Sequence, residues 1–196
     1  GTAERTVVLT ETEMTLTFVD VDTPPVPSLL RHFSAPVILD CEYSDADLLT
    51  LLAHDSDAFN RWEAGQRLML RIAINAIADS ALSISASGQI DQDLLPAALV
   101  QAMRDVDAAF KELVLTLPSE SYIAEQLDVV DPQRVHAVRE ALRQQLATAL
   151  HSDWAWAWEQ HQDTGAYRPD AVSAGHRALA GLALHMLCLA ARTSGD

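Results

Sequence analysis

The sequence predicts a mostly α-helical protein with a small antiparallel β portion at its N-terminus. Three observations lead to this fold class. Apolar residues alternate with polar ones before residue 43, they recur at helical spacing after it, and helix start signals continue almost to the end of the chain. At 196 residues with 49% hydrophobic side chains, the chain can bury a sizeable core as one or two domains.

The β portion begins with a hairpin predicted over Arg5 to Val21. Apolar residues alternate here with threonines around a polar break at Thr10 to Glu13, and this period of two favours strands. The segment Thr23 to Pro27 interrupts the ladder, because proline has no backbone N–H to donate. A further strand is predicted over Pro36 to Glu42. Three strands are too few for a complete sandwich.

The pattern becomes helical at Ser44. Ser44 and Asp47 resemble an N-cap arrangement before a short leucine-rich helix. Ser56 is predicted to cap a second helix, which is apolar on nearly every face between Leu68 and Ala78 and is therefore expected at the centre of the fold. The apolar residues that recur along this second helix are Phe59, Trp62, Met69, Ala73 and Ile77.

A small, polar-leaning linker is predicted at Ser83 to Gly88, before the next helices. Residues Leu94 to Leu117 predict one or two helices that end near Pro118. Ser119 is then expected to start a short helix through Leu127.

Two longer helices are predicted in the last third of the chain. Asp131-Pro132 joins an N-cap carboxylate to proline at the first helical position, and its helix is expected to continue to about Gln162. Gly165 breaks that helix, and a last one runs from Pro169-Asp170 to roughly Arg192. Successive helices with short links suggest stacked α-hairpins of a solenoid, although no internal sequence period is visible.

The charge balance excludes one broad class of function. Thirteen lysines and arginines against 28 aspartates and glutamates give a formal charge of -15. Phosphate binding needs clustered cations, so a nucleic-acid-binding role is not expected. The acidic surface is interpreted as a source of solubility rather than as a ligand site.

Cysteine use and apolar stretches indicate a cytoplasmic protein. Cys41 and Cys188 form no CxxC pair, which fits a reducing compartment, although a bridge between them is left open. Residues 1–13 lack the basic and apolar regions of a secretory signal. The longest apolar stretch, Ala178 to Ala191, is shorter than the ~20 residues that span a bilayer, so it predicts a buried helix.

The motifs that carry common enzymatic chemistry are missing. A zinc-binding HExxH needs two histidines on one helix face with glutamate as the base, yet no histidine here is followed by glutamate. GxGxxG, GxSxG and P-loop patterns are also absent. A dispersed metal site around His54, Asp55 and Asp57 is possible, but such residues at a helix start are more often caps. The sequence thus predicts no catalytic, cofactor-binding or metal-ligating residue.

Two groups of side chains are interpreted as packing contacts rather than as catalytic or binding residues. In the run Trp154-Ala155-Trp156-Ala157-Trp158, helical geometry puts the outer tryptophans on one face and Trp156 nearly opposite, so Trp156 is expected to be the more exposed. The alternative is a ligand or partner contact. A second group is expected to tie the β portion to the helices, with substrate binding as its alternative: Arg31, Arg61, Arg67, Phe59 and Trp62.

Several linked stretches of the sequence carry a family resemblance. They are PVPSLLRHFSAPVIL (Pro25 to Leu39), HDSDAFNRWEAGQRL (His54 to Leu68), VLTETEMTLTF near Val8 and the weaker DVVDPQRVHAVREAL (Asp128 to Leu142). In this order and spacing they resemble the bacterial aminopeptidase N branch of the zinc metallo-aminopeptidases. The family's GAMEN and HExxH motifs are both absent from this chain.

The resemblance implies a fragment that follows the family's catalytic domain. Residues 1–43 would form the C-terminal part of an Ig-like β-sandwich domain, and residues 44–196 the first part of a helical C-terminal domain. The whole enzyme would use zinc to release N-terminal amino acids from peptides, whereas this chain would be structural and inactive alone. Its expected partners are the remaining parts of the same polypeptide, with self-association when isolated, and neither nucleic acid nor membrane.

Two alternatives to this hypothesis are kept open. One is a stand-alone α-helical protein-interaction module, since helical repeats offer extended binding surfaces. The weaker one is an unrelated metalloenzyme.

Overall fold

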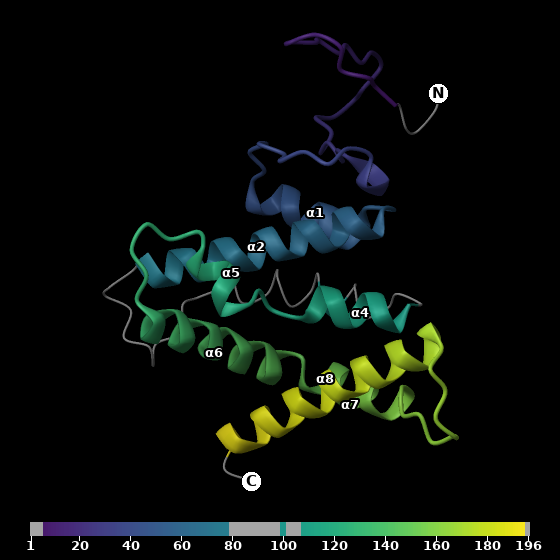
Figure 1. Cartoon of the computed structure of the whole chain (residues 1–196), viewed down its shortest axis with the longest axis vertical. Helices are drawn as coiled ribbons and strands as arrows, with labels where there is room; N and C mark the ends of the chain where they lie inside the picture. Colours follow the sequence, from purple (N-terminus) through teal and green to yellow (C-terminus); the bar gives the residue numbers. More distant parts are fainter. Residues whose placement is uncertain (1–5, 79–98, 101–106, 195–196) are drawn as a thin grey trace.

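A computed structural model describes residues 6–78, 99–100 and 107–194 of the chain. Figure 1 shows an extended N-terminal segment leading into helices that are stacked along the long axis of the molecule. A short 3-10 helix, η1, spans Arg31–Phe33. The α-helices of the described residues are α1 Asp45–His54, α2 Ala58–Ala78, α4 Ala108–Leu115, α5 Glu120–Ala124, α6 Pro132–Ala149, α7 His151–Gln160 and α8 Ala171–Ser194.

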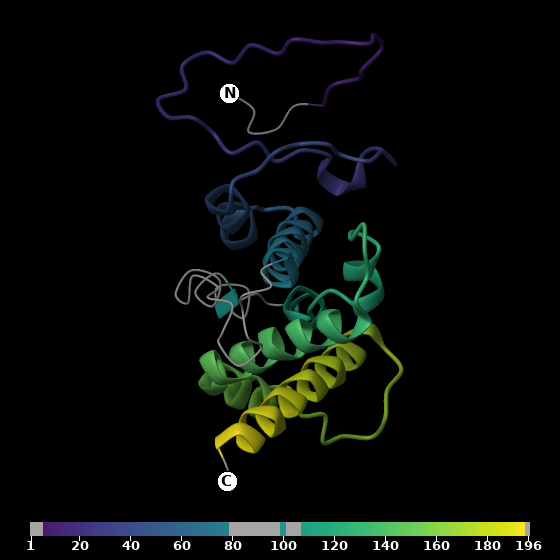
Figure 2. The same cartoon turned by 90° about the vertical axis from the view of Figure 1, so that its left-hand side faces the viewer.

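Two long helices organise the stack. Helix α2 packs against η1, α1, α4, α5 and α6, which confirms the central place expected for it. Helix α8 packs against α4, α6 and α7 at the other end of the molecule. In Figure 2 the N-terminal segment, the α1–α2 pair and the α6–α8 group follow one another from top to bottom. The mostly helical part of the fold prediction is confirmed.

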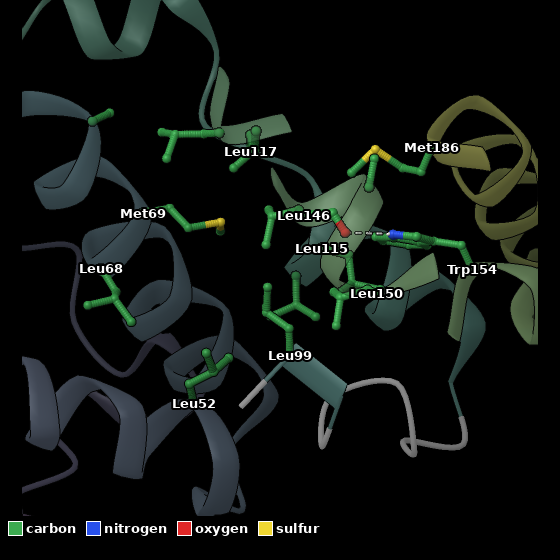
Figure 3. Packing of buried hydrophobic residues seen from close by; sticks show 14 of the residues in the cluster. Leu52, Leu68, Met69, Leu99, Leu115, Leu117, Leu146, Leu150, Trp154 and Met186 are labelled. Atoms are coloured by element: carbon green, nitrogen blue, oxygen red, sulfur yellow. Dashed lines mark hydrogen bonds between the residues drawn. The ribbon is translucent and has the colours of Figure 1, made fainter. Parts of the chain in front are cut away.

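The core runs between these layers. Figure 3 shows Leu52, Leu68 and Met69 of α1 and α2 directed toward Leu115, Leu146 and Leu150 of the following helices. Trp154 and Met186 extend the same cluster toward α7 and α8. Leucine and methionine therefore hold the two halves of the helical stack together.

Three predicted helix starts are confirmed by their caps. Ser44 and Asp47 form a capping box, in which each side chain accepts from the other residue's backbone N–H at 3.2 and 3.0 Å. Ser119 accepts from the Tyr122 N–H, and Asp131 accepts from the N–H groups of two residues of α6. Local side chains satisfy the first amides of these helices.

The predicted cap of α2 was wrong by one residue. The Asn60 N–H donates to Asp57 Oδ1 at 2.9 Å, because Asp57 immediately precedes the first helical residue. Ser56 Oγ instead accepts from Arg31 Nη2 at 2.7 Å.

The single helix expected from Asp131 to Gln162 is two helices. Helix α6 ends at Ala149, Leu150 adopts φ −106° and ψ 23°, and α7 begins at His151. No glycine or proline marks this bend in the sequence. The change of direction buries both Leu150 and Trp154 in the core, so tertiary packing determines it.

The predicted strands of Arg5–Val21 and Pro36–Glu42 are not confirmed. Residues 6–44 contain no strand in the described structure, and several of their apolar side chains are exposed, including Val8, Phe18 and Ile38. A strand needs a neighbour to satisfy its backbone groups, and an isolated hairpin is marginal in water. The linker predicted at Ser83–Gly88 lies outside the described residues, as do residues 94–98 and 101–106 of the helices expected over Leu94 to Leu117. Helix α4 forms the last part of that stretch and ends at Leu115, close to the end predicted near Pro118.

Helix α8 is less buried than its composition predicted. It begins and ends close to the predicted bounds, but only one face packs on the core. Ala171–Arg192 is also long and apolar enough to cross a membrane, and 28% of its most apolar 18 residues are buried in the fold. One such helix is weak evidence for a membrane role. Its exposed residues include Ala178, Gly181, Leu184, His185 and Cys188.

Candidate functional site

A network of polar contacts fastens the N-terminal segment to the start of α2. We call this network the joint and define it by Ser28, Leu29, Arg31, His32, Asp55, Ser56, Asp57 and Asn60. At its centre Arg31 Nη1 donates to Asp55 Oδ1 at 2.6 Å and to Ser28 Oγ at 2.9 Å. The Asp55 side chain is 1% exposed, so this ion pair is largely removed from water.

The joint also maintains a strained turn. Leu30, His32 and Phe33 have φ of 54°, 56° and 54°, a left-handed conformation that non-glycine residues rarely adopt. Asp57 Oδ2 accepts from the His32 N–H at 3.0 Å and lies 2.9 Å from His32 Nδ1. Asn60 Nδ2 donates to the Leu29 carbonyl at 2.9 Å. The buried start of α2 therefore fixes a backbone shape that the turn would not keep by itself.

The joint changes the acidity of its buried carboxylate. Burial raises the pKa of Asp55, but hydrogen bonds from Ser28, the Asp57 backbone and Arg31 outweigh it and lower the pKa below the ordinary value. A lowered folded-state pKa means that the stabilisation is present above the unfolded-state value and is lost as the pH falls through the folded value. The Arg31–Asp55 pair is thus intact at neutral pH.

Arginines further along α2 fasten the rest of the N-terminal segment. Arg67 donates to the Cys41 carbonyl at 2.9 Å, and its guanidinium lies 5.4 Å from the Tyr43 ring centroid. Arg71 donates to the Tyr43 carbonyl at 3.0 Å. The Tyr43 hydroxyl donates to the Pro27 carbonyl at 2.9 Å, and burial, followed by Cys41, raises the pKa of Tyr43 to about 12. Tyr43 therefore stays a neutral donor.

The tying role predicted for the arginines is confirmed for Arg31 and Arg67. Arg61 on α2 donates to the Leu52 carbonyl at 3.1 Å and lies 4.8 Å from the Phe110 ring centroid, so these contacts join α2 to α1 and α4. Sequence reasoning missed Ser28 and Asn60 as parts of the joint, and it missed the contact of Arg71 with Tyr43. Buried Asn60 gave no signal, because its partners lie about 30 residues away.

An aromatic contact accompanies the polar joint. Phe33, at the end of the strained turn, meets Phe59 edge-on with 5.3 Å between ring centroids. Phe59 in turn lies 5.7 Å from Trp62, which packs partly buried against the core. The interpretation of Phe59 and Trp62 as anchors between the two parts of the chain is consistent with these contacts.

The metal alternative around His54, Asp55 and Asp57 is not supported by the geometry. Asp55 binds Arg31 and the Asp57 N–H, Asp57 caps α2, and His54 is exposed at the end of α1. These carboxylates serve as caps and as an ion-pair partner, as the simpler interpretation predicted.

Among the described residues, one group with metal-ligand chemistry comes together elsewhere. Donor atoms of Glu120, His136 and Glu140 lie within 4.8 Å of one another at the surface of α5 and α6. His136 Nδ1 is 2.8 Å from Glu120 Oε1, while Glu140 pairs with Arg143 and lies 3.7 Å from Arg139. The two arginines already neutralise the Glu140 carboxylate that a metal ion would need, so the group is an ion-pair network.

The tryptophan run behaves as helical geometry predicted. Trp154 is 1% exposed, Trp158 is partly buried, and Trp156 is 44% exposed. Lys111 Nζ lies 5.2 Å from the Trp156 ring centroid, although Lys111 itself is 4% exposed.

Cys41 and Cys188 are free thiols, which answers the open question of a bridge.

Replacing Arg31 with glutamine is expected to release the turn of residues 28–33 from the helices. The change removes the guanidinium from Asp55 and leaves a buried carboxylate without its cation. Amide exchange over residues 28–33 is expected to accelerate severalfold while α6 keeps its protection, which hydrogen exchange with mass spectrometry measures in one experiment. Arg168→Gln, which alters an exposed arginine, is the control; equal exchange in both variants would contradict the role given to Arg31.

Known proteins resemble this chain over most of its length. Residues 45–196 match a family described as a domain of unknown function with ARM repeats, DUF3458_C, and residues 1–42 match DUF3458, described as an Ig-like fold. Aminopeptidase N of Caulobacter vibrioides is 36% identical over 88% of the chain and 20% of its own length. Aminopeptidase N of Escherichia coli is 39% identical over 72% of the chain and 16% of its own length.

A solved structure is also similar to this chain in its fold. The Legionella pneumophila aminopeptidase A, in complex with aspartic acid, superposes with a TM-score of 0.73 at 26% identity, covering 90% of this chain and 21% of its own. The chain thus spans about a fifth of the length of these relatives. It belongs to the DUF3458_C family of ARM-repeat domains and is related to bacterial aminopeptidase N.

Proposed function

We propose that this chain is a non-catalytic structural part of an aminopeptidase N. The observation that carries the proposal is the alignment with the Caulobacter vibrioides relative, which takes in 88% of this chain but only 20% of the relative. The sequence holds neither HExxH nor GAMEN. Zinc and the peptide-cleaving residues would therefore belong to another part of the polypeptide, which is the proposed main partner of this chain.

The structural role we propose is rigid coupling between two domains. We divide the chain into residues 1–43, as part of an Ig-like sandwich, and residues 44–196, as part of the helical domain. The joint supports this role, because Arg31, Asp57 and Asn60 connect the two sides through buried or half-buried polar contacts. Hydrogen bonds and ion pairs have preferred distances and angles, so contacts of this kind fix orientation more strictly than apolar contact does. We further propose that the whole protein is cytoplasmic.

The purified chain is expected to be inactive as an exopeptidase. We expect no release of nitroaniline from leucyl- or alanyl-p-nitroanilide above the buffer blank, and no stoichiometric zinc by elemental analysis, because the chain lacks the family's zinc motif. Aminopeptidase N of Escherichia coli serves as the positive control. Hydrolysis by this chain that a chelator abolishes would overturn the proposal. Light scattering of the same sample over a range of concentrations tests the self-association expected of the isolated chain.

A stand-alone interaction module remains the second candidate. The exposed face of α8 favours it, because small and weakly polar residues recur there at alternate spacings of four and three residues, a pattern that suits helix packing. The residues of this face are Ala174, Ala178, Gly181, His185 and Cys188, and the charged Arg192 follows at its end. The reading frame upstream of Gly1 separates the candidates: GAMEN and HExxH there support the aminopeptidase, and their absence supports the module.

A further inference from the structure

Two histidines and a lysine gather where the connection between α7 and α8 meets α4. His161 ends α7 and is 7% exposed. Its ring meets the rings of Trp156 and His176 edge-on, with 5.6 and 5.1 Å between centroids. Lys111 of α4 approaches the same Trp156 ring at 5.2 Å. We call Lys111, Trp156, His161 and His176 the clasp.

We propose that the clasp is a proton-sensitive device, which keeps the α7–α8 connection docked on α4 at neutral pH and releases it on mild acidification. This device does not depend on the proposed function. It concerns the stability of residues 156–176, to which no catalytic or metal-binding role is given above.

Hydrogen bonding shows where a proton is added. His161 Nδ1 lies 3.0 Å from the Ala157 carbonyl oxygen. A carbonyl oxygen only accepts, so Nδ1 carries the hydrogen of the neutral ring and Nε2 is the basic atom. Acidification therefore adds a proton at Nε2 and turns His161 into a buried cation.

The charged groups around His161 oppose that cation. Lys111 faces it from α4 and His176 faces it from α8, while α7 offers the Trp156 ring and the Ala157 carbonyl. On the connection itself, Asp163 pairs with Arg177 at 2.9 Å. A charge on His161 would thus be buried beside a lysine and a second histidine ring, with the Ala157 carbonyl as the favourable contact.

The pKa of His161 follows this geometry. Burial lowers it most, Lys111 and His176 lower it further, and the hydrogen bond to Ala157 opposes them without reversing the direction. The unfolded chain therefore binds the proton more tightly than the folded one. The stabilisation is complete above about pH 6.5 and is lost as the pH falls through the folded-state value.

The clasp lies beside a close contact between α4 and α8. An added Cβ at Gly175 would sit 2.9 Å from the Ala109 backbone nitrogen, so the two backbones almost touch one residue before His176. A movement of the His176 ring away from a charged His161 would disturb this contact. Protonation is thus coupled to the docking of the first turns of α8.

Hydrogen exchange of the whole chain tests the proposal. After correction for intrinsic exchange, protection of residues 156–176 is expected to fall severalfold between about pH 7.5 and about pH 5.5, while α1 and α2 keep theirs. His161→Gln removes the titration but keeps a donor for the Ala157 carbonyl, so its protection should not depend on pH in this window. His151→Gln, at the exposed start of α7, should behave like the unmodified chain.

A second measurement keeps the test decisive if His161→Gln fails to fold. The C2 proton of His161 in the unmodified chain should titrate by NMR below the ordinary histidine pKa of about 6.5. Titration of His161 at or above that ordinary value would overturn the proposal. So would unchanged protection of residues 156–176 across the window, or the same loss in His161→Gln.

Discussion

Replacing Trp154 with alanine is expected to lower the free energy of unfolding by about 3 to 5 kcal/mol. The side chain is 1% exposed and lies in the core beside Leu150 and Met186, where Figure 3 shows it reaching between α7 and the preceding helix. Its Nε1–H donates to the Leu146 carbonyl at 3.1 Å. Truncation therefore leaves a cavity and removes a buried donor. Urea unfolding followed by circular dichroism measures the loss without relying on tryptophan fluorescence.

Trp156→Ala on the same helix is the matched control. That ring is 44% exposed, and its directed contacts are with the ammonium of Lys111 and the edge of the His161 ring. We expect a smaller loss of about 1 to 2 kcal/mol, because the contacts are few and removal of a half-exposed ring leaves little cavity. Equal costs for the two variants would mean that α7 is not oriented with Trp154 inward.

Replacing Gly175 with leucine is expected to destabilise the protein by about 3 kcal/mol, the upper part of the usual range for overpacking. A Cβ at this position would meet three atoms of Ala109 at 2.9 to 3.2 Å, and two of them belong to the backbone. A backbone cannot rotate away as a side chain can, so α8 would have to move off α4. Thermal unfolding at one pH measures the effect.

Gly181→Leu, two turns further along α8, should have the opposite sign or no effect. Nothing lies within 4 Å of a Cβ built there, and leucine favours a helix over glycine by up to about 1 kcal/mol. A similar loss at both glycines would show that the helix itself, rather than the contact with Ala109, is sensitive to substitution.

Local signals explain which parts of the fold were predictable. Ser44 with Asp47, Ser119, and Asp131 with Pro132 marked helix starts correctly, because a cap is built from residues within three positions of the amides that it satisfies. The outward direction of Trp156 followed from the helical repeat alone. The bend at Leu150 was missed, since no breaker marks it and only the burial of Leu150 and Trp154 accounts for it.

The contacts between the N-terminal segment and the helices were also predictable only in part. Arg31 and Arg67 stood out in the sequence as arginines among apolar residues, and both bind the opposite part of the chain. Asn60 and Arg71 did not stand out, and the contacts of Arg61 with α1 and α4 were not predicted. Each of these side chains depends on a group that approaches only after the chain has folded.

The sequence by itself determined the helical class of this protein, most of its helix starts and its relation to aminopeptidase N, because these rest on local spacing and on linked stretches of residues. Only the tertiary structure decided which side chains form the joint, which face of α8 stays exposed, and that Lys111, His161 and His176 meet. The reason is physical. Hydrogen bonding and burial act across space between residues far apart in the sequence, such as Arg134 and Ala76 at a separation of 58 positions, and no local pattern encodes which partner will arrive.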